Sequence, residues 1–167
     1  PEAQVDRFMM KVLVGYPTEE EEFVIVSRVT GAMQAVARIA STGQLLALQK
    51  KVRELYVDPN LMQFAVKVVA ATRDPESVGL KDAARLITYG ASPRGTIGMI
   101  EAGRALAFLR GRDYVLPEDV VDVTADVLRH RIVLSYEALS DGTSADDLIR
   151  QILKAVPDSV LWLLDTI

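Results

Sequence analysis

The residues best suited to chemistry lie at 90–94, where Gly-Ala-Ser-Pro-Arg precedes a long stretch of helical periodicity. Ser92 is a natural N-cap, because its hydroxyl can accept a hydrogen bond from a free backbone N–H, and Pro93 suits the first helical position. Arg94 then lies at a helix N-terminus, where the free N–H groups and the dipole attract anions. A cation is unfavourable there unless an anion such as a phosphate lies nearby. The pattern predicts either a solvated first-turn arginine or an anion-binding one.

Composition excludes most other kinds of site. The 167 residues include no cysteine and one histidine, which excludes disulfides, thiolate nucleophiles and multi-histidine metal sites, so no metal ligands are expected. No nucleophile, base and orienting group form a recognisable set, so a self-contained enzyme is the poorest interpretation. The single histidine, His130, is expected to be a packed or capping residue. Its neighbours Arg129 and Arg131 are expected to form a charged helix end rather than a phosphate site.

Charge and hydropathy limit the partners. The chain is 50% hydrophobic and 25% charged, as in ordinary globular proteins. Its net charge of −4 and pI near 5.1 argue against nucleic acid as a partner. No apolar run approaches the ~18 residues of a membrane span and no signal peptide is visible, so no membrane span is expected and the cytoplasm is the expected location. The chain begins at Pro1 without a methionine, which suggests an excised piece of a longer protein.

Helical periodicity dominates the elements that must position Arg94. Thr18 and Glu21 form a capping box ahead of a helix whose buried stripe is expected to be Phe23, Val26 and Val29. Further helices are expected over about 45–55, 59–73, 80–89, 93–110, 117–131 and 144–156, whereas 31–40 is ambiguous. Three glycines within 93–110 suggest close packing or a close ligand, since each weakens a helix interior by about 1 kcal/mol.

The remaining segments look extended or apolar. Residues 1–8 resemble the last turns of a helix, and the apolar run 9–15 is typical of a strand covered on both faces. The pairs Tyr56-Val57 and Tyr114-Val115 are each followed by a proline-started helix, and we expect them to form a minimal β-bridge. The tail 160–167 is apolar enough to require a docking surface. The predicted architecture is an all-α bundle of about six helices with an α/β stub at its N-terminus.

Taken together, these stretches resemble the C-terminal part of a MoxR-type AAA+ ATPase. Four stretches carry the resemblance, in the order and at the approximate spacing of the family: 1–17, with Asp-Arg-Phe at 6–8; 61–73, ending in Ala-Ala-Thr-Arg; 90–94; and 111–131. The match runs from residue 1 to about 156. Residues 157–167 lie outside it.

The resemblance implies roles for individual residues. Arg7 resembles the arginine finger, which crosses a subunit interface to a neighbour's γ-phosphate. Arg94 resembles the sensor-2 arginine of the lid, with Ser92 and Pro93 in the same nucleotide-binding element, and whether Arg94 acts in cis or in trans is left open. Tyr16 and Pro17 correspond to the hinge on the adenine side. Arginine suits both phosphate roles because it stays charged and offers a planar fork of donors.

The resemblance also implies the fold and the domains. The expected fold is mostly α: a helical AAA+ lid domain over 18–156, a remnant of the α/β nucleotide-binding core over 1–17 (helix end, last strand and hinge), and an apolar tail over 157–167. ATP and Mg²⁺ are the implied cofactors of the intact protein. The chain contains no Gly-x-x-x-x-Gly-Lys-Ser/Thr motif and no strand ending in paired acidic residues, so alone it is expected to bind no cofactor and hydrolyse no ATP.

The implied partners are further copies of the protein in a ring, expected to be a hexamer, and client proteins that it matures or assembles, with von Willebrand factor A-domain proteins among them. The alternative is a free-standing helical protein-interaction module. It accounts for the bundle and the tail but leaves the strand and both arginines unexplained. A helix-turn-helix DNA binder is disfavoured by the acidic charge. A P-loop encoded upstream of Pro1 would decide for the ATPase.

Overall fold

The computed structural model describes residues 2–32 and 35–156, and for residues 2–3 the backbone alone. Its elements are, in chain order, α1 (Glu2–Val5), α2 (Glu19–Thr30), α3 (Thr42–Glu54), α4 (Pro59–Arg73), the 3₁₀ turn η1 (Pro75–Val78), α5 (Lys81–Ala84), β1 (Ile87–Tyr89), α6 (Pro93–Leu109), α7 (Pro117–Leu128), β2 (Val133–Leu134), α8 (Tyr136–Ser140) and α9 (Ala145–Ala155). The mostly α fold is confirmed. The docking predicted for the tail 160–167 falls outside the described residues.

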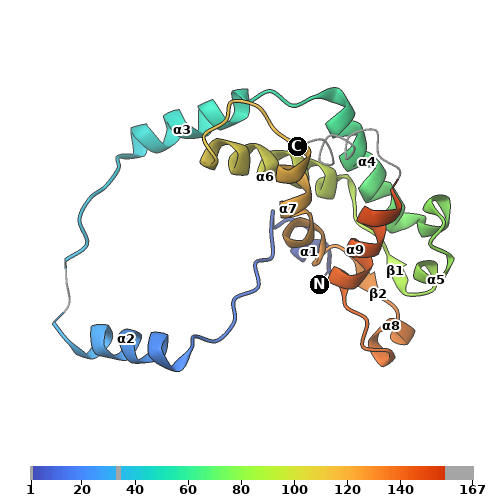
Figure 1. Ribbon diagram of the computed structural model, residues 1–167, viewed down its shortest axis with the longest axis horizontal. Helices are drawn as coiled ribbons and strands as arrows, with labels where there is room; N and C mark the ends of the chain where they lie inside the picture. The colour runs from blue at the N-terminus through green and yellow to red at the C-terminus, as the bar shows by residue number, and fades with distance from the viewer. Residues whose placement is uncertain (1, 33–34, 157–167) are drawn as a thin grey trace.

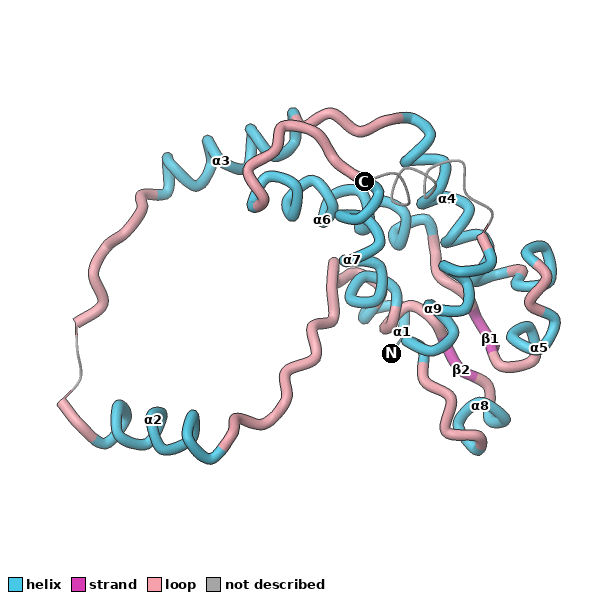
Figure 2. Tube along the Cα trace, in the orientation of Figure 1, coloured by secondary structure: helices cyan, strands magenta, loops and turns pink. Residues whose placement is uncertain are grey.

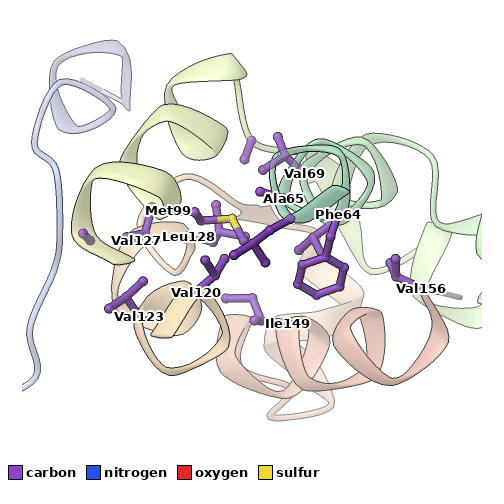
Figure 3. Close-up of a cluster of buried hydrophobic side chains, with 14 of the residues drawn as sticks. Phe64, Ala65, Val69, Met99, Val120, Val123, Val127, Leu128, Ile149 and Val156 are labelled. Carbon is purple, nitrogen blue, oxygen red and sulfur yellow. The ribbon is translucent and has the colours of Figure 1, made fainter. Parts of the chain in front are cut away.

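Four helices, α4, α6, α7 and α9, enclose the core (Figure 1, Figure 2). Each contributes fully buried apolar side chains at helical spacing, as Figure 3 shows. The largest of these are Leu61, Val68 and Val69 from α4, Met99 from α6, Val120, Val127 and Leu128 from α7, and Leu148, Ile149 and Ile152 from α9. The helices predicted at 59–73, 93–110 and 144–156 are confirmed, and the one predicted at 117–131 ends at Leu128.

The glycines of α6 allow α6 and α7 to pack at close range. A Cβ at Gly95 would lie 2.8 Å from Leu128 Cδ2, and a Cβ at Gly98 would lie 2.9 Å from Val127 Cγ1. Both distances are shorter than real Cβ contacts, so side chains there would force the helices apart. Of the two explanations open at the sequence level, the structure therefore supports close packing.

The predicted β-bridge is present. Tyr56 and Tyr114 pair in parallel, with the Tyr56 N–H donating to Asp113 O at 3.2 Å and the Val115 N–H donating to Tyr56 O at 3.0 Å. The bridge fixes the starts of α4 and α7 beside each other, since Pro59 begins α4 and Pro117 begins α7.

The helix predicted over 80–89 is wrong. The helix α5 covers Lys81–Ala84, and β1 then pairs antiparallel with β2. The sequence Ile87-Thr88-Tyr89 is β-branched and aromatic, which favours a strand once a partner strand is available. That partner comes from residues 133–134, more than forty positions away, so the local pattern could not reveal it.

The strand predicted over 9–15 is not formed in this structure. The segment is irregular, and no strand among the described residues pairs with it. Val12, Leu13 and Val14 are 63%, 61% and 90% exposed. A strand requires a neighbouring backbone to satisfy its N–H and C=O groups, and an apolar run alone does not supply one.

The helix α2 forms as predicted but buries none of its residues. Its capping box is confirmed, because the Glu21 N–H donates to Thr18 Oγ1 and the Thr18 N–H donates to Glu21 Oε2 at 2.9 Å. The buried stripe was wrong: Phe23, Val26 and Val29 are 73%, 52% and 75% exposed. The helix lies apart from the packed helices (Figure 1), so its apolar face contacts no described surface. In the described part of the chain, no helix is both long and apolar enough to cross a membrane.

Candidate functional site

The loop carrying Gly90 to Arg94 is held by the C-terminal end of α4. The Ala91 N–H donates to the buried hydroxyl of Thr72 at 2.9 Å, and Arg73 Nη1 donates to Ala91 O at 2.7 Å. Gly90 packs so closely on this end of α4 that a Cβ would lie 2.3 Å from Thr72 O. The Ala-Ala-Thr-Arg stretch and the Gly-Ala-Ser-Pro-Arg stretch are thus two halves of one structural unit.

Ser92 and Pro93 begin α6 as predicted. The Arg94 N–H donates to Ser92 Oγ at 3.2 Å, which is the expected N-cap bond, and Pro93 is the first helical residue. Ser92 Oγ also donates to the Asp6 carboxylate, at 3.0 Å to Oδ2 and 3.2 Å to Oδ1. Arg94 Nη1 lies 3.6 Å from Asp6 Oδ2, and the Arg94 side chain is 54% exposed. The anion beside Arg94 in this structure is therefore a carboxylate of the chain itself.

Sequence reasoning missed the position of Arg131, which is buried beside Asp6. It was interpreted as part of a helix-end charge group, whereas its side chain is 3% exposed and Nε lies 3.1 Å from Asp6 Oδ1. Its guanidinium also donates to backbone carbonyls, from Nη2 to Phe8 O at 2.6 Å and from Nη1 to Met9 O at 3.0 Å. Burial lowers the pKa of Arg131 from its usual value, and the attraction to Asp6 offsets only part of that effect.

The two residues preceding Arg131 bind the same N-terminal segment. Arg129 Nη1 donates to Lys11 O at 2.6 Å, and His130 Nε2 lies 3.0 Å from Phe8 O. Burial lowers the pKa of His130 more than the bond to the Phe8 carbonyl raises it. We call residues 129–131 the Arg-His-Arg clamp. It follows the C-terminal end of α7 directly, and no local sequence signal shows that its partners are residues 6–11.

Arg7 and Arg94 come together in the structure. Both line one pocket of about 160 Å³, together with Asp6, Arg131, Met9, Ile97, Gly98 and Glu101. Arg7 is exposed. The guanidinium groups of Arg94 and Arg131 thus contact one carboxylate, that of Asp6, and Arg7 lines the same pocket. Such an arrangement suits an oxyanion with several acceptor oxygens.

Tyr16 and Pro17 lie elsewhere. They line a separate pocket at the start of α2 with Val14, Glu20 and Ile25 among its other walls, and Tyr16 is fully exposed. The structure therefore brings Ser92, Pro93, Arg94 and Arg7 to one place, and leaves the two predicted hinge residues outside it.

A second arginine–carboxylate cluster stabilises the start of α7. Asp119 is 0% exposed and accepts from Arg112 at 2.6 and 2.7 Å, from Arg110 at 2.8 Å and from the Leu116 N–H at 2.8 Å. Burial raises the pKa of Asp119, but the bonds from Arg112, Leu116 and Arg110 together hold it below its usual value. Every donor comes from the loop at 110–116, so the cluster fixes this loop on the first turn of α7.

Comparison with known proteins assigns the family. Residues 79–152 match the AAA lid domain, a range that contains α5 to α8 and most of α9. The chain is 47% identical over 156 residues to Chaperone MoxR1 of Mycobacterium tuberculosis, covering 93% of this chain and 41% of that protein. It is 37% identical over 147 residues to Protein MoxR of Paracoccus denitrificans, covering 81% of this chain and 43% of that protein. This chain belongs to the MoxR family of AAA+ ATPases.

A solved structure supports the same assignment. A protein described as an ATPase from Cytophaga hutchinsonii superimposes with a TM-score of 0.89 at 40% identity, over 94% of this chain and 48% of that one. The chain thus spans less than half the length of each of these relatives. It corresponds to the C-terminal part of a MoxR-family AAA+ ATPase.

Proposed function

We propose that this chain is the sensor-bearing lid part of a MoxR-type AAA+ ATPase and that it supplies Arg7 and Arg94 to the phosphates of ATP. The observation that carries the proposal is the shared pocket: two exposed arginines from distant parts of the chain meet at the N-terminal end of α6. A helix N-terminus and two guanidinium groups together favour a multiply charged phosphate over a single carboxylate.

The same geometry bears on whether Arg94 acts in cis or in trans. Arg94 and Arg7 of one subunit line the same pocket, so they are placed to reach the same nucleotide. If Arg7 is a finger directed at a neighbouring subunit, Arg94 acts on that neighbour's nucleotide as well. Such an arginine raises turnover by roughly 10³–10⁵. It does so only where other residues bind the nucleotide and Mg²⁺, because this chain contains no P-loop.

The rest of the proposal follows the family. Residues 18–156 form the lid domain and 1–17 belong to the nucleotide-binding core, whose hinge residues Tyr16 and Pro17 contact the adenine. The intact protein assembles as a ring, a hexamer, in the cytoplasm and uses ATP hydrolysis to mature client proteins, among them von Willebrand factor A-domain proteins. The chaperone name of the M. tuberculosis relative supports the proposed role in maturing client proteins.

The test is ATP turnover by the intact ATPase carrying Arg7→Ala or Arg94→Ala. We expect Arg7→Ala to lower kcat by about 10³ or more and Arg94→Ala to cripple turnover, because each variant loses charge stabilisation of the transition state. Arg150→Ala is the matched control, since Arg150 is exposed and, within residues 2–32 and 35–156, its partner is Asp147 on its own helix. Wild-type turnover by Arg94→Ala would refute the role of this residue and favour the interaction-module alternative.

A further inference from the structure

We propose that Arg131 is a positioning residue that fixes Arg7 relative to Arg94 by holding the backbone on both sides of Arg7. The proposal rests on the function proposed above for those two arginines. Arg131 donates from Nη2 to Asp6 O at 3.1 Å and to Phe8 O at 2.6 Å, and from Nη1 to Met9 O at 3.0 Å. One guanidinium therefore binds the carbonyls immediately before and after Arg7.

Arg131 is itself held by α7. Its Nη1 also donates to Val127 O in the last turn of that helix, and its side chain is 3% exposed. Only arginine offers five donors in one rigid plane, which is what several convergent carbonyls require. A buried guanidinium in such contacts has little freedom to rotate, so it fixes the segment that carries Arg7 relative to α7.

Polar contacts are the main attachment of that segment. Residues 6–11 form no helix and no strand, and Phe8 and Met9 are 68% and 44% exposed, so the apolar burial of this segment comes from Met10, which packs partly buried against the core. Other attachments come from the remaining members of the Arg-His-Arg clamp, from Ser92 and Arg94 on the Asp6 carboxylate, and from the Lys11 N–H, which donates to Asp126 O at 2.8 Å. Removal of Arg131 therefore takes the donor from Asp6 O and Met9 O and leaves Phe8 O with the His130 contact.

The Asp6 carboxylate connects Arg131 with Arg94. Its carboxylate lies 3.1 Å from Arg131 Nε and 3.6 Å from Arg94 Nη1 and accepts from Ser92 Oγ. The contact to Arg94 is long and half exposed, so it is the one that an incoming phosphate can replace. The contact between Asp6 and the buried Arg131 remains. It keeps Arg7 in place relative to α6 when Arg94 exchanges Asp6 for the phosphate.

The first experiment measures the attachment directly in this chain. Amide hydrogen exchange at Lys11 reports whether the segment is bound to α7, because that N–H donates to Asp126 O. We expect Arg131→Ala to speed exchange at Lys11 by at least about tenfold while amides of α4 keep their protection. Arg112→Ala is the matched control: it also removes a largely buried arginine, but one that pairs with Asp119 far from Arg7.

The second experiment measures positioning in the intact ATPase. Arg131→Ala is expected to lower kcat with little change in the KM for ATP, and to lower it little further when Arg7 is already alanine, because it acts through Arg7. Arg131→Lys keeps one charged donor group and is expected to recover part of the loss. If Arg131 had a purely structural role, Arg131→Ala would instead lower kcat by the same factor in the wild-type background and in the Arg7→Ala background.

The outcomes separate the two proposals. Unchanged Lys11 exchange in Arg131→Ala, or additive losses in the double variant, would overturn the positioning role. Wild-type turnover in Arg7→Ala would overturn the proposed function, and Lys11 exchange would then decide alone whether Arg131 holds the segment. Faster exchange at Lys11 with a non-additive loss of kcat supports both.

Discussion

Gly90 and Asp119 show how single residues are constrained by atoms far away in the sequence. Gly90 has no positive φ and is not required by a turn; it is required because the α4 backbone occupies the space of a Cβ. Asp119 is a fully buried carboxylate that is tolerated because two arginines and one N–H surround it. Both positions support the loops that begin α6 and α7.

We expect Gly90→Ala to lower the free energy of unfolding by about 1–3 kcal/mol or more, because a Cβ 2.3 Å from Thr72 O requires the backbone to move. Thermal unfolding of the chain measures the effect. Gly43→Ala is the control, since the nearest atom there is 3.9 Å away and alanine favours helix, so its midpoint should be unchanged or slightly raised. Equal midpoints for the two variants would contradict the close contact.

Asp119→Asn is expected to destabilise the chain most at neutral pH. The pKa of Asp119 is lower in the folded than in the unfolded chain, so its contribution is present above the unfolded value of about 3.9 and is lost as pH falls through the folded value. The unfolding midpoint, measured from pH 7 to pH 2.5, should therefore converge for the wild type and the variant at the acid end. A constant difference across the range would show that the carboxylate charge is not what stabilises this loop.

At the scale of elements, the face shared by α6 and α7 decides where the arginines lie. Small residues on α6 meet large ones on α7, and the same face approaches the N-terminal segment, since Met9 O would lie 3.7 Å from a Cβ at Gly98. The Arg-His-Arg clamp follows α7 directly. Separating the two helices would therefore move Arg94 away from Arg131 and Arg7.

Gly98→Val is expected to lower the free energy of unfolding by about 1–3 kcal/mol, because its side chain would meet Val127 at less than van der Waals distance. Denaturant unfolding measures this loss, and hydrogen exchange at Lys11 should rise in the same variant. Gly43→Val places the same side chain on the exposed start of α3 and controls for valine's helix propensity. Full stability in Gly98→Val would show that α6 and α7 are not closely packed at this point.

At the scale of the whole molecule, the chain has two unlike parts. Residues 55–156 share one core, whereas many apolar side chains of residues 12–32 and 35–48 are exposed. The helix α2 lies away from the packed helices (Figure 1). Exposed apolar surface of this extent favours burial against another surface. The chain spans less than half of its relatives, and in the intact ATPase the nucleotide-binding half is where we expect that surface.

Limited digestion with trypsin should distinguish the two parts. We expect cleavage after Arg28 and Arg38 well before cleavage after Arg129 or Arg131, because the first two lie in exposed chain and the second two are bonded to residues 6–11. Mass spectrometry of the early fragments identifies the sites. Early cleavage after Arg131 would contradict the described attachment of the clamp.

Local sequence was sufficient where the physical cause is local. The capping box of α2, the Ser92 cap and the proline-started helices depend on side chains within three residues of the backbone groups they satisfy, so their positions could be predicted. The Tyr56–Tyr114 bridge was predictable because two similar stretches precede two similar helices. The local position of Arg94 at a helix N-terminus left a solvated and an anion-binding interpretation open, and family spacing decided between them. Arg7 was identified through that spacing alone.

By itself, then, the sequence determined a mostly α chain, the starts of α2, α4, α6 and α7, its family and the candidate residues Arg7 and Arg94. Tertiary structure alone decided that β1 replaces the end of a predicted helix, that the glycines of α6 let α7 pack closely, and that the apolar face of α2 is exposed. It also decided that Arg131 binds the backbone around Arg7 and that Tyr16 and Pro17 lie apart from the arginines. The physical reason is the same in each case: these features depend on partners many residues away, and periodicity and capping report only on neighbours.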